Sequence, residues 1–291
     1  MMIKSSLVAL ITPFRNGEVD EDALRKMVHW HIEQGTDGLV PMGTTGESAT
    51  LNPEEHGRVT EIVVREVAGR IPVVAGAGSN DTRSAIYNNN HAQEIGADAA
   101  LHVAGYYNRP SQEGLFRHFE AVHEASGIPI IVYNIPPRAI VDIKPETMAR
   151  IAALPRVVGV KDATGDLNRP ILERLLINKE FSFLSGEDGT AVAYNAAGGN
   201  GCISVTANVA PALCAQMQQA CADGNFREAA GIQQRLMPLH MALFTEPSPA
   251  GVKYAASLLG LCGDDCRLPI VPLSGDAKSA IQDAMSALDL I

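Results

Sequence analysis

The feature that most constrains the fold is an alternation of eight short apolar runs with longer amphipathic segments over residues 1–224. Several of the runs are almost continuously apolar, as is typical of parallel strands that helices cover on both faces. Eight strand–helix units in about 225 residues match a (β/α)8 TIM barrel, whereas an open, doubly wound sheet is the alternative. We expect the strands at residues 7–11, 38–41, 73–75, 100–103, 130–133, 157–161, 181–184 and 202–205.

The pattern changes after Gly224, where runs of the strand type stop. Helical periodicity continues at 225–244, 248–259 and 277–288, which predicts a C-terminal helical region, residues 225–291, packed on a catalytic barrel of residues 1–224. No stretch typical of a linker separates the two parts. Within the barrel, a helix is expected to begin after Asn52, with Pro53 at its first position and Glu55 completing a capping box.

Composition excludes several classes of protein. Lysine and arginine number 23 and aspartate and glutamate 33, a net charge of −10, which argues against binding to nucleic acid or anionic lipid. No apolar run approaches the roughly 18–20 residues that span a bilayer. The five cysteines form no Cys-x-x-Cys pair, so we expect reduced thiols in the cytoplasm. The histidines show no metal-ligand spacing, and Gly76-x-Gly78 lacks the third glycine of a dinucleotide loop, so we expect neither metal nor nucleotide.

Lys161 is the most informative single residue, because it ends the apolar run at 157–160. Active sites of (β/α)8 barrels lie at the carboxyl ends of the strands. Burial there is expected to lower the pKa of the amine, which leaves it able to attack a carbonyl carbon and form a Schiff base. A lysine that only pairs with the neighbouring Asp162 is the alternative.

Tyr133 ends the preceding strand, and adjacent parallel strands lie about 4.8 Å apart, so its phenol is expected to face Lys161. A phenol between two hydroxyl groups can relay a proton, first as a general acid and then as a base. A core tyrosine with a satisfied hydroxyl is the alternative. Thr44 and Thr45, in a Gly-Thr-Thr-Gly turn after another strand, offer hydroxyls for such a relay and amides for a carboxylate, although this sequence is often only a turn.

Five segments together carry a more specific signal: Gly43-Thr44-Thr45-Gly46-Glu47, Tyr107-Asn108-Arg109-Pro110, Tyr133-Asn134-Ile135-Pro136-x-Arg138, Val160-Lys161-Asp162-Ala163-Thr164-Gly165 and Gly201-Cys202-Ile203-Ser204. In this order and spacing they resemble the 4-hydroxy-tetrahydrodipicolinate synthase (dihydrodipicolinate synthase) family, which belongs to the superfamily of N-acetylneuraminate lyase and other pyruvate-dependent class I aldolases. The resemblance runs from about Ser6 to the C-terminal helices. Thr44 and Arg138 favour the synthase over the sugar-acid aldolases.

The resemblance implies a lyase that condenses pyruvate with L-aspartate 4-semialdehyde, in the diaminopimelate pathway of lysine biosynthesis, without a cofactor. It implies that Lys161 forms the imine, that Tyr133 relays protons, and that Thr44 and Tyr107 complete a triad. Tyr107 of this family reaches the site of a neighbouring subunit, so we expect a homo-oligomer, a tetramer built as a dimer of dimers. The implied substrate-binding residues are Thr45, Ile203, Gly186 and Arg138, the last for the carboxylate of the aldehyde.

The resemblance also implies an effector cleft between subunits. In lysine-inhibited members of the family the corresponding residues line the cleft, and here they are Ser48, Ala49, His56, Asn80 and Tyr106. Those members carry a glutamate where this chain has Ser84. A serine hydroxyl offers only a neutral acceptor for the ammonium group of lysine. We therefore expect weak or absent inhibition by lysine, unless Asp81 supplies the missing charge.

The sequence is also compatible with two other functions. One is a pyruvate aldolase for a sugar acid or hydroxy-oxo acid, which would use the same Lys161 and Tyr133 but need groups that bind hydroxyls more than a second carboxylate clamp. The other is a small-molecule sensor without activity. The sensor is the less favoured of the two, because the nucleophile and the relay residues are all present.

Overall fold

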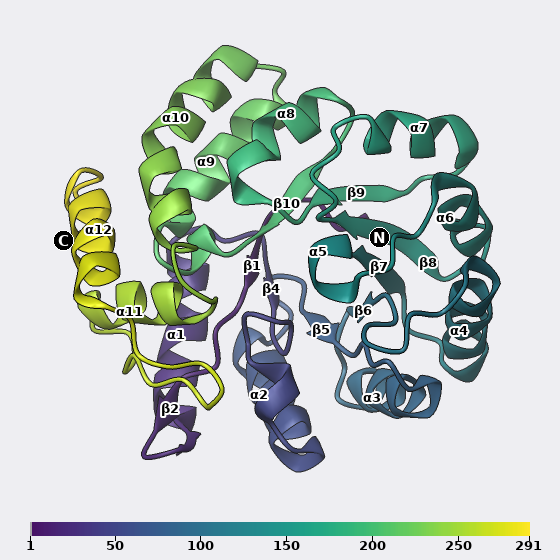
Figure 1. The fold of residues 1–291 in the computed structure, drawn as a ribbon, viewed down its shortest axis with the longest axis horizontal. Helices are drawn as coiled ribbons and strands as arrows, with labels where there is room; N and C mark the ends of the chain where they lie inside the picture. Colours follow the sequence, from purple (N-terminus) through teal and green to yellow (C-terminus); the bar gives the residue numbers. More distant parts are fainter. Residues whose placement is uncertain (1) are drawn as a thin grey trace.

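In the computed structural model, which describes residues 2–291, eight parallel strands form a barrel that helices surround (Figure 1). The strand order is β4-β1-β10-β9-β8-β7-β6-β5, and a parallel bridge between Leu39 and Val73 joins the two ends of the sheet. The predicted (β/α)8 barrel is confirmed, and the open sheet is excluded. The strands are β1 (Ser5–Ala9), β4 (Gly38–Val40), β5 (Val74–Gly76), β6 (Ala99–Val103), β7 (Ile130–Asn134), β8 (Val157–Asp162), β9 (Ser182–Ser185) and β10 (Gly201–Ser204).

Every predicted strand is present, with ends that differ by at most two residues. The largest difference concerns β1, which begins and ends two residues before the expected range of 7–11. Ladder pairing stops there because the Ile11 amide donates to the Asn208 side chain (3.1 Å) and not to a neighbouring strand. A short hairpin of β2 (Phe14–Arg15) and β3 (Glu18–Val19) was not predicted, since two residues are too few to show an alternating pattern.

Helices follow the strands and cover the outside of the barrel. The predicted capping box is confirmed: the Asn52 side chain accepts from the Glu55 amide, and the Glu55 carboxylate accepts from the Asn52 amide, both at 2.9 Å. The helices of the barrel are α1 (Glu21–Glu33), α2 (Pro53–Val67), α3 (Thr82–Glu94), α4 (Gln112–Ala125), the short α5 (Pro136–Ala139), α6 (Pro145–Ala152), α7 (Arg169–Leu176), α8 (Ala191–Ala196) and α9 (Pro211–Ala222).

The chain ends in three further helices, α10 (Phe226–Ala242), α11 (Ala250–Leu258) and α12 (Gly275–Ser286), which lie together on one side of the barrel, toward the C-terminus in Figure 1. Their buried residues, such as Leu236, Val252 and Ile281, belong to the same apolar cluster as Leu24 of α1. The three predicted helices are thus present, and one core joins them to the barrel. The boundary of two domains after residue 224 stays a prediction.

A separate apolar cluster fills the inside of the barrel. Leu7, Val40, Leu101, Ile131 and Leu184 are fully or almost fully buried there, as expected for a packed core and not a pore. This layer forms the floor beneath the carboxyl ends of the strands. Among the helices of residues 2–291, none is long and apolar enough to cross a membrane.

Candidate active site

Lys161 and Tyr133 lie side by side at the carboxyl ends of β8 and β7. The register of the two strands pairs them directly, and the Lys161 Nζ lies 4.2 Å from the centroid of the Tyr133 ring. Both side chains are largely buried, with exposed fractions of 7% and 6%. The amine therefore rests on the face of the phenol in a part of the barrel mouth from which most water is excluded.

The carboxylate next to Lys161 belongs to a different environment. Successive side chains of a strand point to opposite faces, and the Asp162 carboxylate accepts from the Thr164 amide at 2.8 Å, outside the barrel interior. Burial raises the pKa of Asp162. Among the described residues, Lys161 makes no ion pair with Asp162, so the alternative in which the two only neutralise each other is wrong.

Main chain and apolar side chains border Lys161 on its other side. Leu184 of β9 is its register partner, and Ile203 of β10 is almost completely buried. Gly186 follows β9, and a Cβ atom at this position would lie 3.1 Å from the Lys161 Cε and 2.9 Å from the Ala163 Cβ. Only glycine therefore lets the β9 loop pass so close to the lysine.

Hydrogen bonds within the chain fix the turn that carries Thr44 and Thr45. The Glu47 amide donates to the Thr44 carbonyl (3.1 Å), and the Thr12 hydroxyl donates to the Gly46 carbonyl (2.7 Å). Thr45 is buried below the turn, whereas Thr44 is exposed on it. The two threonines therefore present their side chains to different surroundings.

The Gly76-x-Gly78 pair has a packing explanation. A Cβ atom at Gly76 would lie 2.1 Å from the Met42 carbonyl oxygen, and one at Gly78 would lie 2.4 Å from the Val103 amide nitrogen. Both glycines are needed because the chain passes directly against neighbouring backbone. Gly76 makes room for the backbone that leads into the turn with Thr44, and Gly78 makes room for the end of β6.

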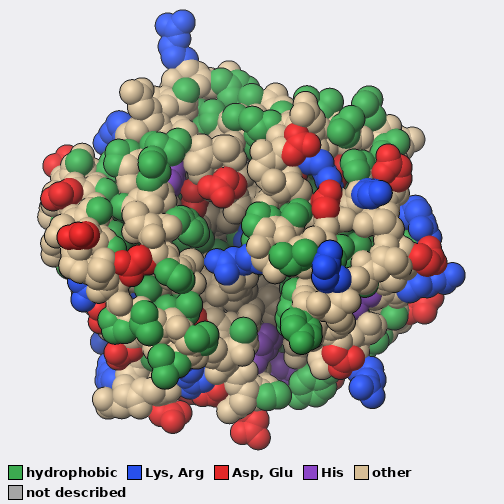
Figure 2. Space-filling model, viewed as in Figure 1, with side chains coloured by type: hydrophobic (Ala, Val, Ile, Leu, Met, Phe, Trp, Pro, Cys, Tyr) green, Lys and Arg blue, Asp and Glu red, His purple; other side chains and the backbone are tan. Residues whose placement is uncertain are grey.

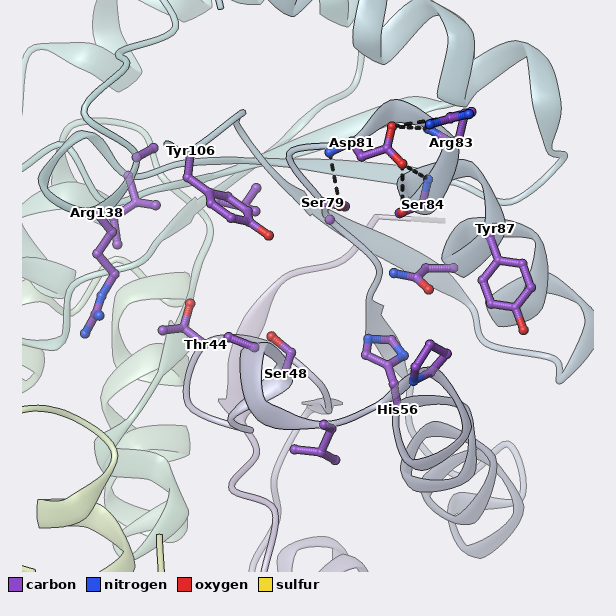
Figure 3. Close-up of a pocket in the computed structure, with 18 residues that line it drawn as sticks. Thr44, Ser48, His56, Ser79, Asp81, Arg83, Ser84, Tyr87, Tyr106 and Arg138 are labelled. Atoms are coloured by element: carbon purple, nitrogen blue, oxygen red, sulfur yellow. Dashed lines mark hydrogen bonds and ion pairs between the residues drawn. The ribbon is translucent and has the colours of Figure 1, made fainter. Parts of the chain in front are cut away.

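A cavity of about 800 Å³ adjoins this turn, and Figure 3 shows the residues that line it. Thr44 and Arg138 lie toward one end, Asp81 and Ser84 lie at the other, and the Tyr106 ring projects between them (Figure 3). Figure 2 shows a hollow near the centre of the same face, with basic side chains in it and histidine side chains nearby. Of the predicted effector residues, four line the cavity: Ser48, Ala49, His56 and Tyr106.

Seven of the predicted site residues do not line this cavity: Lys161, Tyr133, Tyr107, Thr45, Ile203, Gly186 and Asn80. Lys161 and Tyr133 lie inside the barrel mouth, where the cavity does not reach. Asn80 adjoins the cavity through its neighbours Ser79 and Asp81, and its carbonyl accepts from the Asn108 side chain at 2.8 Å. The large cavity is therefore separate from the pocket that holds Lys161.

Tyr107 is the predicted residue that one chain does not bring to the site. Its side chain is 90% exposed, although tyrosine is an amphipathic residue that is usually half-buried. Its backbone has a φ of +68°, and Arg109 has a φ of +48°, in the left-handed region that costs non-glycine residues of order 1 kcal/mol each. A loop of this kind persists when further contacts hold it.

Two buried clusters were missed by sequence reasoning. The Asp188 carboxylate accepts from the Ser204 hydroxyl (2.5 Å) and from the Val205 and Thr206 amides, so it holds the loop that follows Ile203. The second cluster is an ion pair between Lys253 and Glu47 at 2.5 Å. Its sequence signal is a single charged residue within the otherwise uncharged helix α11.

A third buried group, behind β8, titrates in an unusual range. The Arg169 guanidinium pairs with Asp142 at 2.9 Å and with Glu173 at 3.3 Å. Burial raises the pKa of Glu173 to about 8, and the nearby Arg169 offsets this only in part. The carboxyl group is therefore largely neutral below that pH.

Comparison with known proteins agrees with this geometry. Residues 2–288 match the profile of the Dihydrodipicolinate synthetase family. The chain is 60% identical over 290 residues to the 4-hydroxy-tetrahydrodipicolinate synthase of Parvibaculum lavamentivorans, with 100% of both chains covered. It superposes on the chloride-inhibited dihydrodipicolinate synthase of Acinetobacter baumannii complexed with pyruvate, with a TM-score of 0.97, 41% identity and 100% coverage of both chains.

A similar enzyme from Cyanidioschyzon merolae, solved with lysine bound, gives a TM-score of 0.96 at 35% identity, with 99% of both chains covered. The profile match extends over almost the whole chain, and the identities hold across full lengths. The chain therefore belongs to the dihydrodipicolinate synthetase family.

Proposed function

We propose that this chain condenses pyruvate with L-aspartate 4-semialdehyde to give 4-hydroxy-tetrahydrodipicolinate, in the diaminopimelate route to lysine. The full-length similarity to 4-hydroxy-tetrahydrodipicolinate synthases supports this activity. The single structural observation that carries the proposal is the buried Lys161 amine, 4.2 Å from the centroid of the Tyr133 ring and without a carboxylate partner among the described residues. An amine in such surroundings is suited to covalent catalysis on a ketone.

In the proposed reaction the Lys161 Nζ adds to the ketone carbon of pyruvate, and loss of water gives an imine. Loss of a proton from the methyl group converts the imine into an enamine, whose carbon attacks the aldehyde carbon of the second substrate. The amino group of that substrate then closes on the imine carbon, which forms the ring and releases Lys161. Tyr133 and Thr44, with Tyr107 of a neighbouring subunit, would move the protons of these steps.

Binding of the two substrates is proposed to divide between the lysine pocket and the cavity. Gly186 borders Lys161, and Thr45, Gly186 and the main chain at Ile203 would hold the pyruvate carboxylate, for which backbone amides are suitable donors. Arg138 lies on the cavity beside Thr44 and would clamp the carboxylate of the aldehyde, a geometry that suits a guanidinium. Each substrate carries one carboxylate, and each carboxylate would meet its own set of hydrogen-bond donors.

We further propose a homotetramer built as a dimer of dimers, because two separate faces of the chain expose apolar groups. One face carries Tyr106 and Tyr107, on the loop with left-handed backbone. The other is the outer side of α7, where an apolar stripe is exposed to solvent, and exposed patches of this kind mark contacts between proteins. Its residues are Ile171, Leu172, Leu175 and Leu176, and Leu167, two residues before the helix, is also exposed.

The cavity of about 800 Å³ is proposed to be the effector cleft, with a weak response to lysine. The Ser84 hydroxyl donates to the Asp81 carboxylate (2.9 Å) and lowers the pKa of Asp81, so the cavity does hold an anion. However, this carboxylate also accepts from the Arg83 and Ser84 amides as the cap of α3. An anion already engaged in three hydrogen bonds offers less to a ligand ammonium group.

A cytoplasmic location is proposed from the thiols. All five cysteines are unpaired in the structure, and burial raises the pKa of Cys202 and Cys214 far above the range in which a thiolate forms. Unreactive free thiols are typical of a reducing compartment.

A comparison of aldehydes tests the activity. Purified protein is given pyruvate with L-aspartate 4-semialdehyde or with an aldose, and loss of pyruvate is followed in both mixtures. We expect turnover with the semialdehyde and a kcat/KM at least about 100-fold lower with the aldose, since a site built for one set of polar groups rejects another strongly. Faster turnover of the aldose would instead support the sugar-acid aldolase.

A further inference from the structure

We propose that Lys253 is a positioning residue for the active site: through its ion pair with Glu47 it holds the turn that carries Thr44 and Thr45. The proposal rests on the function given above, because it concerns how that site is kept in shape. Lys253 lies on α11, in the C-terminal helical region, and is separated from Glu47 by 206 residues of sequence. The C-terminal helices would thus take part in catalysis indirectly.

Lys253 is a completely buried charged residue. Its exposed fraction is 0%, and its ammonium group donates to the Glu47 Oε1 (2.5 Å) and to the Asp265 carbonyl (2.6 Å). It also lies 4.0 Å from the centroid of the Phe14 ring. Replacement of a buried ion pair by apolar residues is often neutral or stabilising, so such a pair calls for a role other than stability.

Glu47 is held at both carboxylate oxygens. The second oxygen, Oε2, accepts from the Arg267 amide at 2.9 Å, so both contacts come from the C-terminal region. The Glu47 backbone has a φ of +56°, a left-handed conformation that a non-glycine residue adopts only when its surroundings enforce it. Its side chain supplies that enforcement.

The Glu47 backbone in turn closes the turn. Its amide donates to the Thr44 carbonyl at 3.1 Å, and its carbonyl accepts from the Thr50 amide at 3.0 Å and from the Thr50 hydroxyl at 3.1 Å. A change in the Glu47 side chain is therefore transmitted over three residues to Thr44. Thr45, which lies between them, would move as well.

The segment between α11 and α12 also links the C-terminal region to the neighbourhood of the turn. In Figure 1 it crosses from α11 toward α2 and β2. The Arg267 guanidinium, on this segment, pairs with Glu55 at the start of α2 and donates to the Thr50 and Gly17 carbonyls. Arg267 thus contacts the outside of the turn, whereas the buried Lys253 ammonium group contacts the Glu47 carboxylate.

The test compares charge removal at Lys253 with the same change at a half-buried lysine of the same region. Lys253→Met keeps the length of the side chain and removes the charge, whereas Lys253→Arg keeps the charge. Lys278→Met is the matched control, since Lys278 pairs only loosely with Asp264, at 3.7 Å, and neither residue is in contact with the turn. Folding is checked by circular dichroism, and kinetics are measured well below each melting temperature.

We expect Lys253→Met to lower kcat/KM for pyruvate by roughly 100-fold, because displacement of a reacting group by about 1 Å has that effect. The KM for the aldehyde should change less than about threefold, since Arg138 lies on a different element. Lys253→Arg should restore part of the loss, and Lys278→Met should match the unmodified protein. A folded Lys253→Met protein with kcat/KM for pyruvate within about twofold of the unmodified protein would overturn the proposal.

Lys253→Met leaves the buried Glu47 carboxylate without its ion-pair partner, so this variant is the one most prone to misfold. The double variant Glu47→Gln/Lys253→Met removes both charges and keeps both shapes. It is expected to fold and still to show the loss in kcat/KM for pyruvate. Normal kinetics of the folded double variant would overturn the proposal, and so would its failure to fold, because the pair would then be needed by the fold as a whole.

Borohydride trapping separates this proposal from the proposed function. If the unmodified protein gains no pyruvate adduct, the Schiff-base function itself is refuted. If the unmodified and the folded Lys253→Met proteins gain the adduct at equal rates at low pyruvate concentration, only the positioning role is refuted. The positioning role predicts slower trapping in the variant.

Discussion

A single methyl group at position 186 tests how closely the barrel mouth fits around Lys161. In Gly186→Ala, the new Cβ would lie 2.9 Å from the Ala163 Cβ and 3.1 Å from the Lys161 Cε. Carbon atoms in contact lie about 3.5–4.0 Å apart, so the loop or the lysine must move by roughly 0.5–1 Å. Overpacking of this size costs about 1–3 kcal/mol of stability, and displacement of the reacting amine costs up to about 100-fold in rate.

The assay is steady-state turnover together with the melting temperature. We expect the melting temperature of Gly186→Ala to fall by roughly 2–6 °C and kcat to fall about 10- to 100-fold. Gly189→Ala is the matched control, because a Cβ there would meet only Glu187 at 3.5 Å and Met237 at 3.8 Å, which are ordinary contacts. Unchanged turnover and melting temperature in Gly186→Ala would refute the reasoning, since the site would then have room that the structure does not give it.

Four further predictions concern proton transfer, subunit contacts, pH and regulation. Tyr133→Phe should fold normally and lose roughly 10²–10⁴-fold in kcat; a nearly unchanged rate would assign the proton transfer to another group. If Tyr107 acts in the neighbouring subunit, a mixture of the inactive Tyr107→Phe and Tyr133→Phe proteins should regain about a quarter of the activity once their subunits have exchanged. Half of the dimers are then hybrid, and one of the two sites in each hybrid is complete. Mixtures that stay inactive would contradict this role of Tyr107. The pKa of Glu173 is about 8 in the folded protein and near 4.5 in the unfolded chain. The stability that its protonated form contributes is therefore full at low pH and is lost as the pH rises from 4.5 to 8. The melting temperature should fall less over this range in Glu173→Gln than in the unmodified protein, and parallel curves for the two proteins would argue against the raised pKa. Titration with L-lysine should give weak or no inhibition, and Ser84→Glu should strengthen it; strong inhibition that Asp81→Asn abolishes would show that Asp81 supplies the missing charge.

The strands could be predicted because their signal is local. Apolar runs such as 130–133 and 157–161 are long enough to show burial on both faces, and the structure contains each of them. The β2–β3 hairpin could not be predicted in this way, since a distant residue holds its turn: Arg267 donates to the carbonyl of Gly17. Long-range contacts of this kind leave no pattern in the local sequence.

The site was predictable to a similar extent. Strand ends and register follow from local pattern, which is why Lys161 and Tyr133 were expected to be neighbours and are. The partner of Glu47 was not predicted, because Lys253 is 206 residues away and only the folded chain brings the two together. Tyr107 shows a different limit, since its side chain points away from its own chain and its predicted role needs a second subunit.

The central claim is that Lys161 is the amine that forms the covalent intermediate. The protein is incubated with pyruvate and sodium borohydride, and its mass and that of its peptides are measured before and after. We predict a single added pyruvate-derived group on the peptide that contains Lys161, and none in Lys161→Ala, because a buried amine without an ion-pair partner is the favoured nucleophile. An adduct that persists in Lys161→Ala, or the absence of any adduct in the unmodified protein, would contradict the account.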